Sequence, residues 1–221
     1  MPPAVSARSN AALLTPAEWQ AVWLTLDVSA RATLFGLPVA VALAFALARG
    51  RFAGRLLVDR LALAPLVVPT IILSVGLYGL FAKAKLIGEW YGLVAAHTVL
   101  ALPFVVLVTV AGLRDFDRAL EQAAEGLGAS RLQTLLRVTL PLLRPSLVSA
   151  GLLAFISSFD ELVVALFLAG PNMTLPKKMF DNIMMEIDPT IAAVSVMQIL
   201  LVSIVLVLIG RFGRGLPGSA R

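Results

Sequence analysis

The chain has 221 residues, of which 59% are hydrophobic and only 14% charged, and its mean hydropathy is +0.93. This composition excludes an ordinary soluble domain and predicts a single membrane-embedded, all-α domain. Because the chain has no cysteine, disulfides, thiolate metal sites and cysteine nucleophiles are excluded. The net charge of +5 comes mostly from loops, and a bilayer explains it better than a nucleic-acid partner does.

The first long helix is predicted to begin near Pro16. Thr15 and Glu18 have the spacing of a capping box, with proline between them at the first helical position. The apolar run 28–48 is long enough to cross a hydrocarbon core about 30 Å thick. The first eighteen residues lack the continuous apolar core of a signal peptide. Residues 1–15 are expected to form an extracytoplasmic N-terminal segment, from the distribution of basic residues described below.

Asp27 and Arg31 lie four residues apart, so they face the same side of this helix. The interpretation we favour is a local ion pair at the membrane boundary, and the alternative is a gate charge in a transport pathway. Pro38, further along, is expected to kink the helix.

Two further spans are predicted at 61–82 and 92–113. Pro65 and Pro69 free backbone carbonyls in the second span, which predicts a bent helix that lines a cavity. In the third span, a lone histidine, His97, has no partners for a metal site or a catalytic triad, so we expect a hydrogen-bonded packing residue. This span is also expected to be broken at Pro103-Phe104.

A polar segment, 115–141, follows the third span. The run from Ser130 to Gln133 has the form of a second capping box, so we expect two short helices with a turn at Gly126 and Gly128. Pro141 is expected to end the second of these helices, because proline has no donor N–H. A charged rim around the segment is expected from Glu121, Glu125, Arg131 and Arg137.

Two adjacent acids interrupt the fourth predicted span, 142–169, within the run Ser157-Ser158-Phe159-Asp160-Glu161. Counting from the inner boundary at 1.5 Å per residue places Asp160 roughly 26 Å along the helix, in the outer third of the membrane. Ser158 and Glu161 have capping spacing, so the helix is expected to break and restart here. Two roles remain open: the acids line the outer mouth of a path and attract a cation, or they cap a broken helix and bind a neighbouring subunit.

An outer loop, 170–189, precedes the fifth predicted span, 190–210, and residues 213–221 form a tail. A short amphipathic helix at the outer surface is predicted within the loop, with an apolar face of Leu175, Met179, Ile183, Met184 and Ile187. Its charged face consists of Lys177, Lys178, Asp181 and Glu186. This face either contacts a partner protein at the outer surface or is simply solvated.

The distribution of basic residues predicts the orientation of the chain. Most arginines fall on one side of a five-span arrangement, namely Arg49, Arg51, Arg55, Arg60, Arg114, Arg118, Arg131, Arg137, Arg144, Arg211, Arg214 and Arg221. Only Arg8, Lys83, Lys85, Lys177 and Lys178 fall on the other side. The positive-inside rule therefore places the N-terminus outside, and the C-terminus and the 115–141 segment in the cytoplasm.

The 115–141 segment resembles the EAA loop of ABC importer permeases. The resemblance rests on Ala123, Ala124 and Gly128, followed after nine residues by Val138-Thr139-Leu140-Pro141. Gln122 stands where that motif usually has glutamate, and Glu121 precedes it by one position. The resemblance implies a type I importer permease fold of about five transmembrane helices, with a coupling loop that binds an ATPase.

The segment 159–196 is similar to permeases for spermidine and putrescine, as are His97 and Pro103-Phe104. This implies a permease of the bacterial inner membrane, with a second permease subunit, two ATPase subunits, a periplasmic binding protein and lipid as partners. Such permeases usually have one more N-terminal span, so we expect either a start downstream of the natural one or a five-span variant. The coupling contacts implied are Glu121, Gln122, Ala123, Ala124, Gly128, Leu140 and Pro141. If the acids serve a path, which is one of the two roles left open above, the path residues are Ser157, Ser158, Asp160 and Glu161.

No phosphate-binding G-x-x-x-x-G-K-[ST] loop, metal-ligand cluster or catalytic dyad occurs in the sequence. We therefore expect a non-enzymatic subunit without a cofactor of its own, with ATP bound by a partner. Alternatives are the same fold importing ferric ion, an oxyanion, a sugar or another small solute, and a membrane scaffold that moves no solute. Carboxylates at the mouth argue against an anion but do not separate polyamines from ferric ion.

Overall fold

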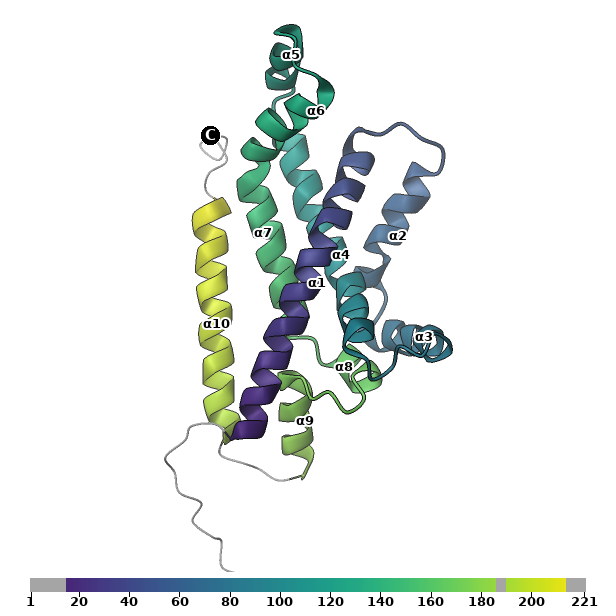
Figure 1. Cartoon of the computed structure of the whole chain (residues 1–221), viewed down its shortest axis with the longest axis vertical. Coiled ribbons are helices and arrows are strands. Elements are labelled where there is room, and N and C mark those ends of the chain that lie inside the picture. The colour runs from purple at the N-terminus through teal and green to yellow at the C-terminus, as the bar shows by residue number, and fades with distance from the viewer. Residues whose placement is uncertain (1–14, 186–189, 214–221) are drawn as a thin grey trace, which may run out of the picture.

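The computed structural model describes residues 15–185 and 190–213, and this part of the chain is helical without a strand. In chain order the helices are α1 (Pro16–Arg49), α2 (Arg55–Val67), α3 (Thr70–Lys83), α4 (Trp90–Asp115), α5 (Ala119–Gly126), α6 (Arg131–Thr134), α7 (Leu140–Phe159), α8 (Val163–Leu168), α9 (Leu175–Met185) and α10 (Thr190–Gly213). A π-helical turn, η1 (Leu135–Thr139), joins α6 to α7. The long helices α1, α4, α7 and α10 run along one axis, and α5 and α6 project at one end (Figure 1).

The described residues contain four helical stretches long and apolar enough to cross a membrane, Pro16–Arg49, Trp90–Asp115, Arg131–Phe159 and Val194–Arg211. The bent pair α2 and α3 makes a fifth if it counts as one broken span. The prediction of an all-α membrane protein with about five spans is therefore confirmed.

The first helix begins at Pro16, as predicted. Thr15 Oγ1 accepts the Glu18 N–H at 3.3 Å, and Glu18 Oε2 accepts the Thr15 N–H at 2.6 Å, so the capping box is complete. α1 continues through Pro38, and α4 continues through Pro103. The predicted break at Pro103 is therefore wrong, because neighbouring groups in a membrane bundle can satisfy the carbonyl that proline leaves free.

Small side chains line the contacts between the central helices. Four buried small residues recur at every fourth position on α1 and four on α7, namely Ala32, Gly36, Ala40 and Ala44, and Ser146, Ala150, Ala154 and Ser158. Ala40, Ala150 and Ala154 share a buried cluster with Ala101 and Val105 of α4. Because lipid is as apolar as the side chains, membrane helices associate by close packing, which small residues permit. α4 therefore lies between two closely packed neighbours.

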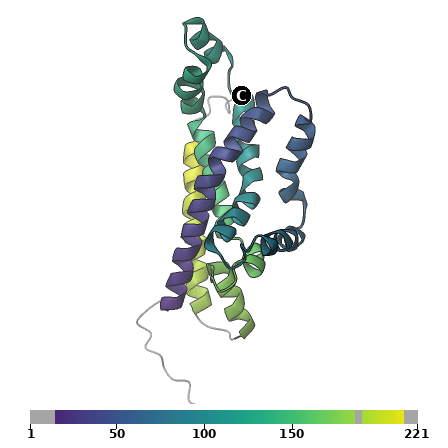
Figure 2. The same ribbon diagram turned by 45° about the vertical axis from the view of Figure 1, so that its right-hand side comes forward.

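The second span is broken rather than gently bent. α2 and α3 meet at an angle of 111° at Val68 and Pro69, and α3 runs across the long axis of the bundle in both views (Figures 1 and 2). Pro69 has no N–H to continue the hydrogen bonds of α2, and it takes the N-cap position of α3. The predicted bend is confirmed, and it is sharper than a kink.

The loops at the end opposite α5 are held together by close contacts. Asn172 Nδ2 donates to the Gly88 carbonyl at 2.6 Å. Gly170 has φ +56°, and a Cβ there would lie 2.8 Å from Gly88 Cα, so only glycine fits. The Leu175 N–H donates to the buried Thr25 Oγ1 at 2.7 Å, which fixes the start of α9 on α1.

The apolar face predicted for the outer helix divides in two. Leu175 is fully buried and Met179 packs beside it, whereas Ile183 and Met184 are exposed. Ile187, the fifth residue predicted for this face, lies outside the described residues, as does Glu186 of the charged face. The first part of α9 thus packs into the bundle instead of lying wholly on the surface.

Gly112 provides a test of the close approach between α4 and α7. A Cβ at this position would collide with Ser146, whose own Cβ would be 2.8 Å away. We expect Gly112→Ala to lower the free energy of unfolding by about 1–3 kcal/mol, because added volume in a packed contact is costly. Thermal unfolding of the purified protein in detergent measures this.

The matched controls are Gly76→Ala and Gly79→Ala in α3, where a Cβ would meet nothing within 4 Å. These changes should leave stability equal or higher, since alanine favours a helix over glycine by about 1 kcal/mol. Equal melting temperatures for all three variants would mean that α4 and α7 do not need this close contact.

Candidate functional site

The projecting loop is built as its local sequence predicts. After α5 the Gly128 N–H donates to the Glu125 carbonyl and the Ala129 N–H to the Ala124 carbonyl, both at 3.0 Å, and Gly128 has φ +92°. This is the hydrogen-bond pattern of a Schellman cap, which favours glycine at the left-handed position. The turn between two short helices is therefore confirmed.

The second capping box is also confirmed, but the helix that it starts does not stop at Pro141. Ser130 Oγ accepts the Gln133 N–H at 3.3 Å, and Gln133 Oε1 accepts the Ser130 N–H at 2.9 Å. From there the helix runs through η1 into α7. The wider π turn directly precedes Pro141, in a region where a normal α-helical turn would clash with the proline ring. The predicted helix end at Pro141 is wrong for this reason.

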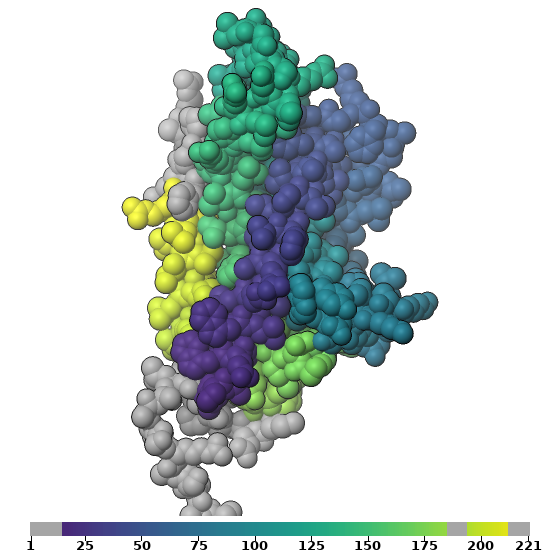
Figure 3. Space-filling view, viewed as in Figure 1, coloured from purple at the N-terminus to yellow at the C-terminus, as the bar shows by residue number. Residues whose placement is uncertain are grey.

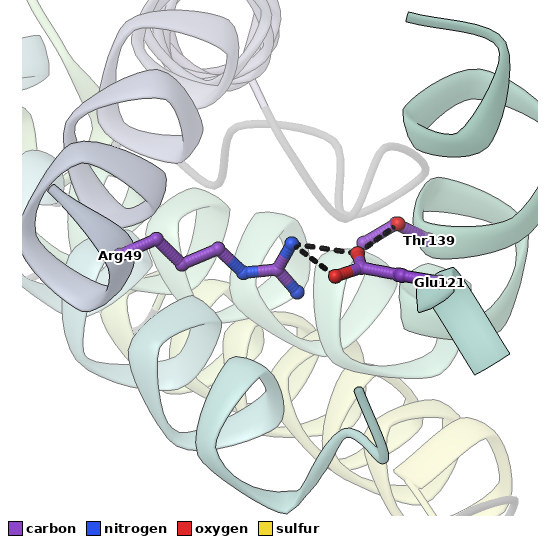
Figure 4. A network of polar contacts seen from close by, with 3 residues as sticks. All are labelled: Arg49, Glu121 and Thr139. Atoms are coloured by element: carbon purple, nitrogen blue, oxygen red, sulfur yellow. Dashed lines mark hydrogen bonds and ion pairs between the residues drawn. The ribbon is translucent and has the colours of Figure 1, made fainter. Parts of the chain in front are cut away.

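Glu121 faces the bundle and not solvent. Its carboxylate is held by Arg49 Nη1, at 2.6 Å to Oε1 and 2.8 Å to Oε2, and accepts a hydrogen bond from Thr139 Oγ1 (Figure 4). The Arg49 guanidinium also lies over the rings of Phe45 and Phe116, at 5.4 and 5.7 Å. With only 16% of its side chain exposed, Glu121 is not part of the charged rim predicted from the sequence. It joins α5 to the end of α1 and to η1.

Other residues form the exposed face of the loop. Gln122, Ala123 and Glu125 are exposed on α5, while Leu140 and Pro141 are half-buried in the helix below. Leu127, which follows α5 at its C-cap, is 90% exposed. It belongs to the loop that projects beyond the bundle in the space-filling view (Figure 3). Sequence reasoning missed Leu127, although an apolar residue at the turn of a polar loop is a usable signal for a contact surface.

The two adjacent acids lie on different sides of α7. Asp160, the residue after α7, is exposed, and its Oδ1 accepts a hydrogen bond from Gln198 Nε2 of α10 at 2.6 Å. Together with Ser195 and Ser203 they border a cavity of about 340 Å³ between α7 and α10. The polar side chains of α10 were not predicted, because they are few and widely spaced in an apolar helix.

Glu161 lies against the broken second span. Its Oε1 accepts the Val164 N–H in the first turn of α8 at 3.0 Å, so it caps α8. The predicted break and restart of the helix is confirmed, but the predicted capping box is wrong, because Ser158 lies inside α7 and Glu161 precedes α8. Glu161 and Ser157 also border a cavity of about 360 Å³ at the junction of α2 and α3. The structure thus brings Ser157 and Glu161 together and separates them from Asp160.

Ser158 lies inside the helix packing, and neither cavity reaches it. It is 1% exposed, and its Oγ lies 2.8 Å from His97 Nδ1, which is also 3.1 Å from the Ser158 carbonyl oxygen. His97 is likewise 1% exposed. The expectation of a hydrogen-bonded packing histidine is confirmed, and the contact joins α4 to the last turn of α7.

Asp27 and Arg31 form the predicted ion pair, with Arg31 Nε 2.8 Å from Asp27 Oδ1. Both side chains are partly exposed, and the Arg31 guanidinium lies 4.6 Å from the Trp90 ring centroid. Interfacial tryptophan and a neutralised arginine are typical of the membrane boundary.

Comparison with known proteins places these features among membrane transport components. Residues 36–216 match the family described as the inner membrane component of binding-protein-dependent transport systems. The molybdenum transport system permease protein ModB of Escherichia coli K12 is 34% identical over 188 residues, which cover 77% of this chain and 82% of that protein. The putrescine transport system permease protein PotI of the same strain is 37% identical over 194 residues, covering 84% and 69%.

Among solved structures, an inward-facing structure of the MetNI methionine ABC transporter matches with a TM-score of 0.69 and 21% identity, over 90% of this chain and 94% of that chain. Sequence identity at this level supports a shared fold only, and not a shared function. The likeness confirms the predicted type I ABC importer permease fold.

The contact between Arg49 and Glu121 can be tested by amide hydrogen exchange. Hydrogen bonds to charged groups contribute about 1.5–3 kcal/mol, so we expect Glu121→Gln or Arg49→Met to speed exchange in 119–126 about tenfold or more. Glu125→Gln, an exposed change on the same helix, is the control and should leave exchange unchanged. If α5 exchanged at the parent rate in both variants, the contact would not be what holds the loop.

Proposed function

Because this chain belongs to the family of inner membrane components of binding-protein-dependent transport systems, and is thus a permease subunit of an ABC importer, we propose that it carries polyamines such as spermidine or putrescine. The observation that carries this proposal is the presence of two carboxylates, Asp160 and Glu161, beside cavities at the broken end of α7. Charged side chains in spans are costly, and where they occur they usually serve a path. Negative charge at the mouth favours a cationic solute.

The relatives support this solute only in part. PotI, a putrescine permease, and ModB, a molybdenum permease, resemble the chain at similar levels. The second candidate is therefore an oxyanion, which the carboxylates disfavour by repulsion. Ferric ion and other small solutes remain candidate solutes for a permease of this fold. Membership of a transport family favours a transport subunit over a membrane scaffold that moves no solute.

We place the projecting loop in the cytoplasm and the α9 end outside. The arginine-bearing loop after α1 lies at the same end of the bundle as α5 and α6 (Figure 1), and the positive-inside rule assigns that end to the cytoplasm. In a bacterial inner membrane, ATPase subunits would then bind residues 121–141, and a periplasmic binding protein would deliver solute at the other end. A second permease subunit would complete the path.

We propose that the exposed face of the loop is the ATPase contact, with Gln122, Ala123 and Leu127 at its surface. Glu121 would not touch the ATPase but would position α5 by binding Arg49 and Thr139. On this proposal Gln122 makes the polar contact with the ATPase that glutamate usually makes in this loop. The adjacent Glu121 contacts only residues of its own chain, Arg49 and Thr139. Closure of the ATPases would move the loop and switch access between the two sides.

Leu127 offers a test of the contact surface. Leu127→Asp should weaken copurification of the ATPase subunit about tenfold or more, because a buried leucine side chain contributes about 1.5–3 kcal/mol. Leu127→Met keeps apolar volume and should copurify as the parent does. Unchanged ATPase binding by Leu127→Asp would place the contact elsewhere on the loop.

The solute is tested by ATP hydrolysis and uptake with the complete complex in lipid membranes, including its binding protein. Spermidine or putrescine should stimulate both, and molybdate or ferric ion should not. The combined change Asp160→Asn and Glu161→Gln should lower polyamine uptake about tenfold or more, on the scale of charge-assisted contacts. Stimulation by molybdate or ferric ion alone would contradict the polyamine proposal and keep the importer.

A further inference from the structure

The cavity at the break between α2 and α3 is lined by apolar side chains together with a few polar ones. Residues 65–70 of the break form one side, Leu100 and Phe104 of α4 form another, and Ser157 and Glu161 complete it. The residues described along these walls include no lysine or arginine. At about 360 Å³, the cavity lies at the lower end of the size range of small-molecule sites.

The backbone of α2 ends beside this cavity, because residues 65–68 border it. The last bond of α2 runs from the Val68 N–H to the Ala64 carbonyl at 3.0 Å, and Pro69 has no N–H to offer. The carbonyls that follow Ala64 are therefore at the helix end, where intrahelical donors are lacking. A helix C-terminus also carries partial negative charge, which stabilises cations.

Glu161 contributes a carboxylate whose charge has no cationic partner among the described ion pairs. Those pairs join Arg31 to Asp27 and Arg49 to Glu121. The cap on α8 uses Glu161 Oε1, so the carboxylate keeps acceptor capacity for a ligand. Across the described chain no group of three histidine, cysteine or acidic residues could hold a metal ion. One carboxylate with carbonyl and hydroxyl oxygens suits a monovalent cation better than a trivalent metal.

We propose that this cavity, named here the break cavity, binds the alkylammonium end of the transported solute. The ammonium group donates to Glu161, Ser157 and the terminal carbonyls of α2, and the alkyl chain packs on Leu100 and Phe104. The aromatic face of Phe104 adds an attraction for the cation. Asp160 takes no part in this subsite, because it is bonded to Gln198 on the side of α10. This inference rests on the proposed polyamine function and assigns the subsite within it.

A carbodiimide that labels carboxyls in apolar surroundings tests the site without transport. The complete permease and ATPase complex in lipid nanodiscs is treated with dicyclohexylcarbodiimide, and labelling of Glu161 and Asp160 is read by peptide mass spectrometry. Putrescine should reduce labelling of Glu161 severalfold and leave Asp160 unchanged. The uncharged analogue 1,4-butanediol should protect neither. No protection of Glu161, or equal protection of both acids, would overturn the assignment.

Uptake kinetics supply the second readout. Glu161→Gln keeps an amide oxygen to accept the Val164 N–H, so the α8 cap can persist while the charge is lost. It should raise the KM for putrescine more than Asp160→Asn does, with binding by the periplasmic protein unaltered. Ser157→Ala, which leaves the cap intact, should give a smaller increase and less protection by putrescine.

The two proposals fail in different ways. Putrescine uptake with a parental KM in Glu161→Gln would overturn the subsite and keep the polyamine importer. Uptake of another solute with no response to polyamines would overturn the polyamine function. If putrescine then failed to reduce carbodiimide labelling of Glu161, the subsite would be overturned as well. If putrescine still reduced this labelling, the result would support a cation site in the break cavity that serves another amine.

Discussion

The structure depends on close packing between helices that gain nothing from hydrophobic association in lipid. α4 packs against the small-residue stripes of α1 and α7, and small buried residues of all three helices share one cluster. Thr98 near Gly36 and Ser146 near Gly112 mark the tightest of these approaches. The hydrogen bond between His97 and Ser158 adds a polar contact in the same interface. All other elements are placed relative to this three-helix core.

At several places the irregular backbone finds partners for its polar groups. Gly128 completes a Schellman cap, a π turn precedes Pro141, and Glu161 caps α8. The C-terminus of α2 differs, because its last carbonyls adjoin a cavity. Non-helical backbone at membrane depth is tolerated when it is buried in protein or lines a cavity. The break that Pro69 makes at the end of α2 is therefore tolerated because the broken segment lines this cavity.

Local patterns in the sequence predicted local structure well. Thr15 with Glu18 and Ser130 with Gln133 form capping boxes because every group involved lies within three residues. The helix end at Pro141 was wrong because tertiary packing competes with propensity: buried Thr139 and Leu143 hold the helix on both sides of the proline.

The candidate site was predicted less completely, because its contacts are distant in sequence. Arg49 lies 72 positions before Glu121, and Gln198 lies 38 positions after Asp160. No local spacing indicates such pairs. Adjacency also misled: the end of α7 turns the chain so that Asp160 and Glu161 face different neighbours. Adjacent residues do not share a face even in regular structure, because successive side chains point to opposite faces of a strand and i, i+1 side chains do not face each other on a helix.

On the proposal that the loop binds an ATPase, the contacts of Glu121 determine how a displacement of the loop reaches the membrane helices. A loop attached only to the start of α7 would act on that helix alone. Here Arg49 also joins the loop to α1, and Thr139 joins it to η1 just before α7. Since α1 and α7 both pack on α4, the three move most easily as one body. The break cavity lies between this body and the α2–α3 pair, so its shape depends on a boundary between more and less tightly packed elements.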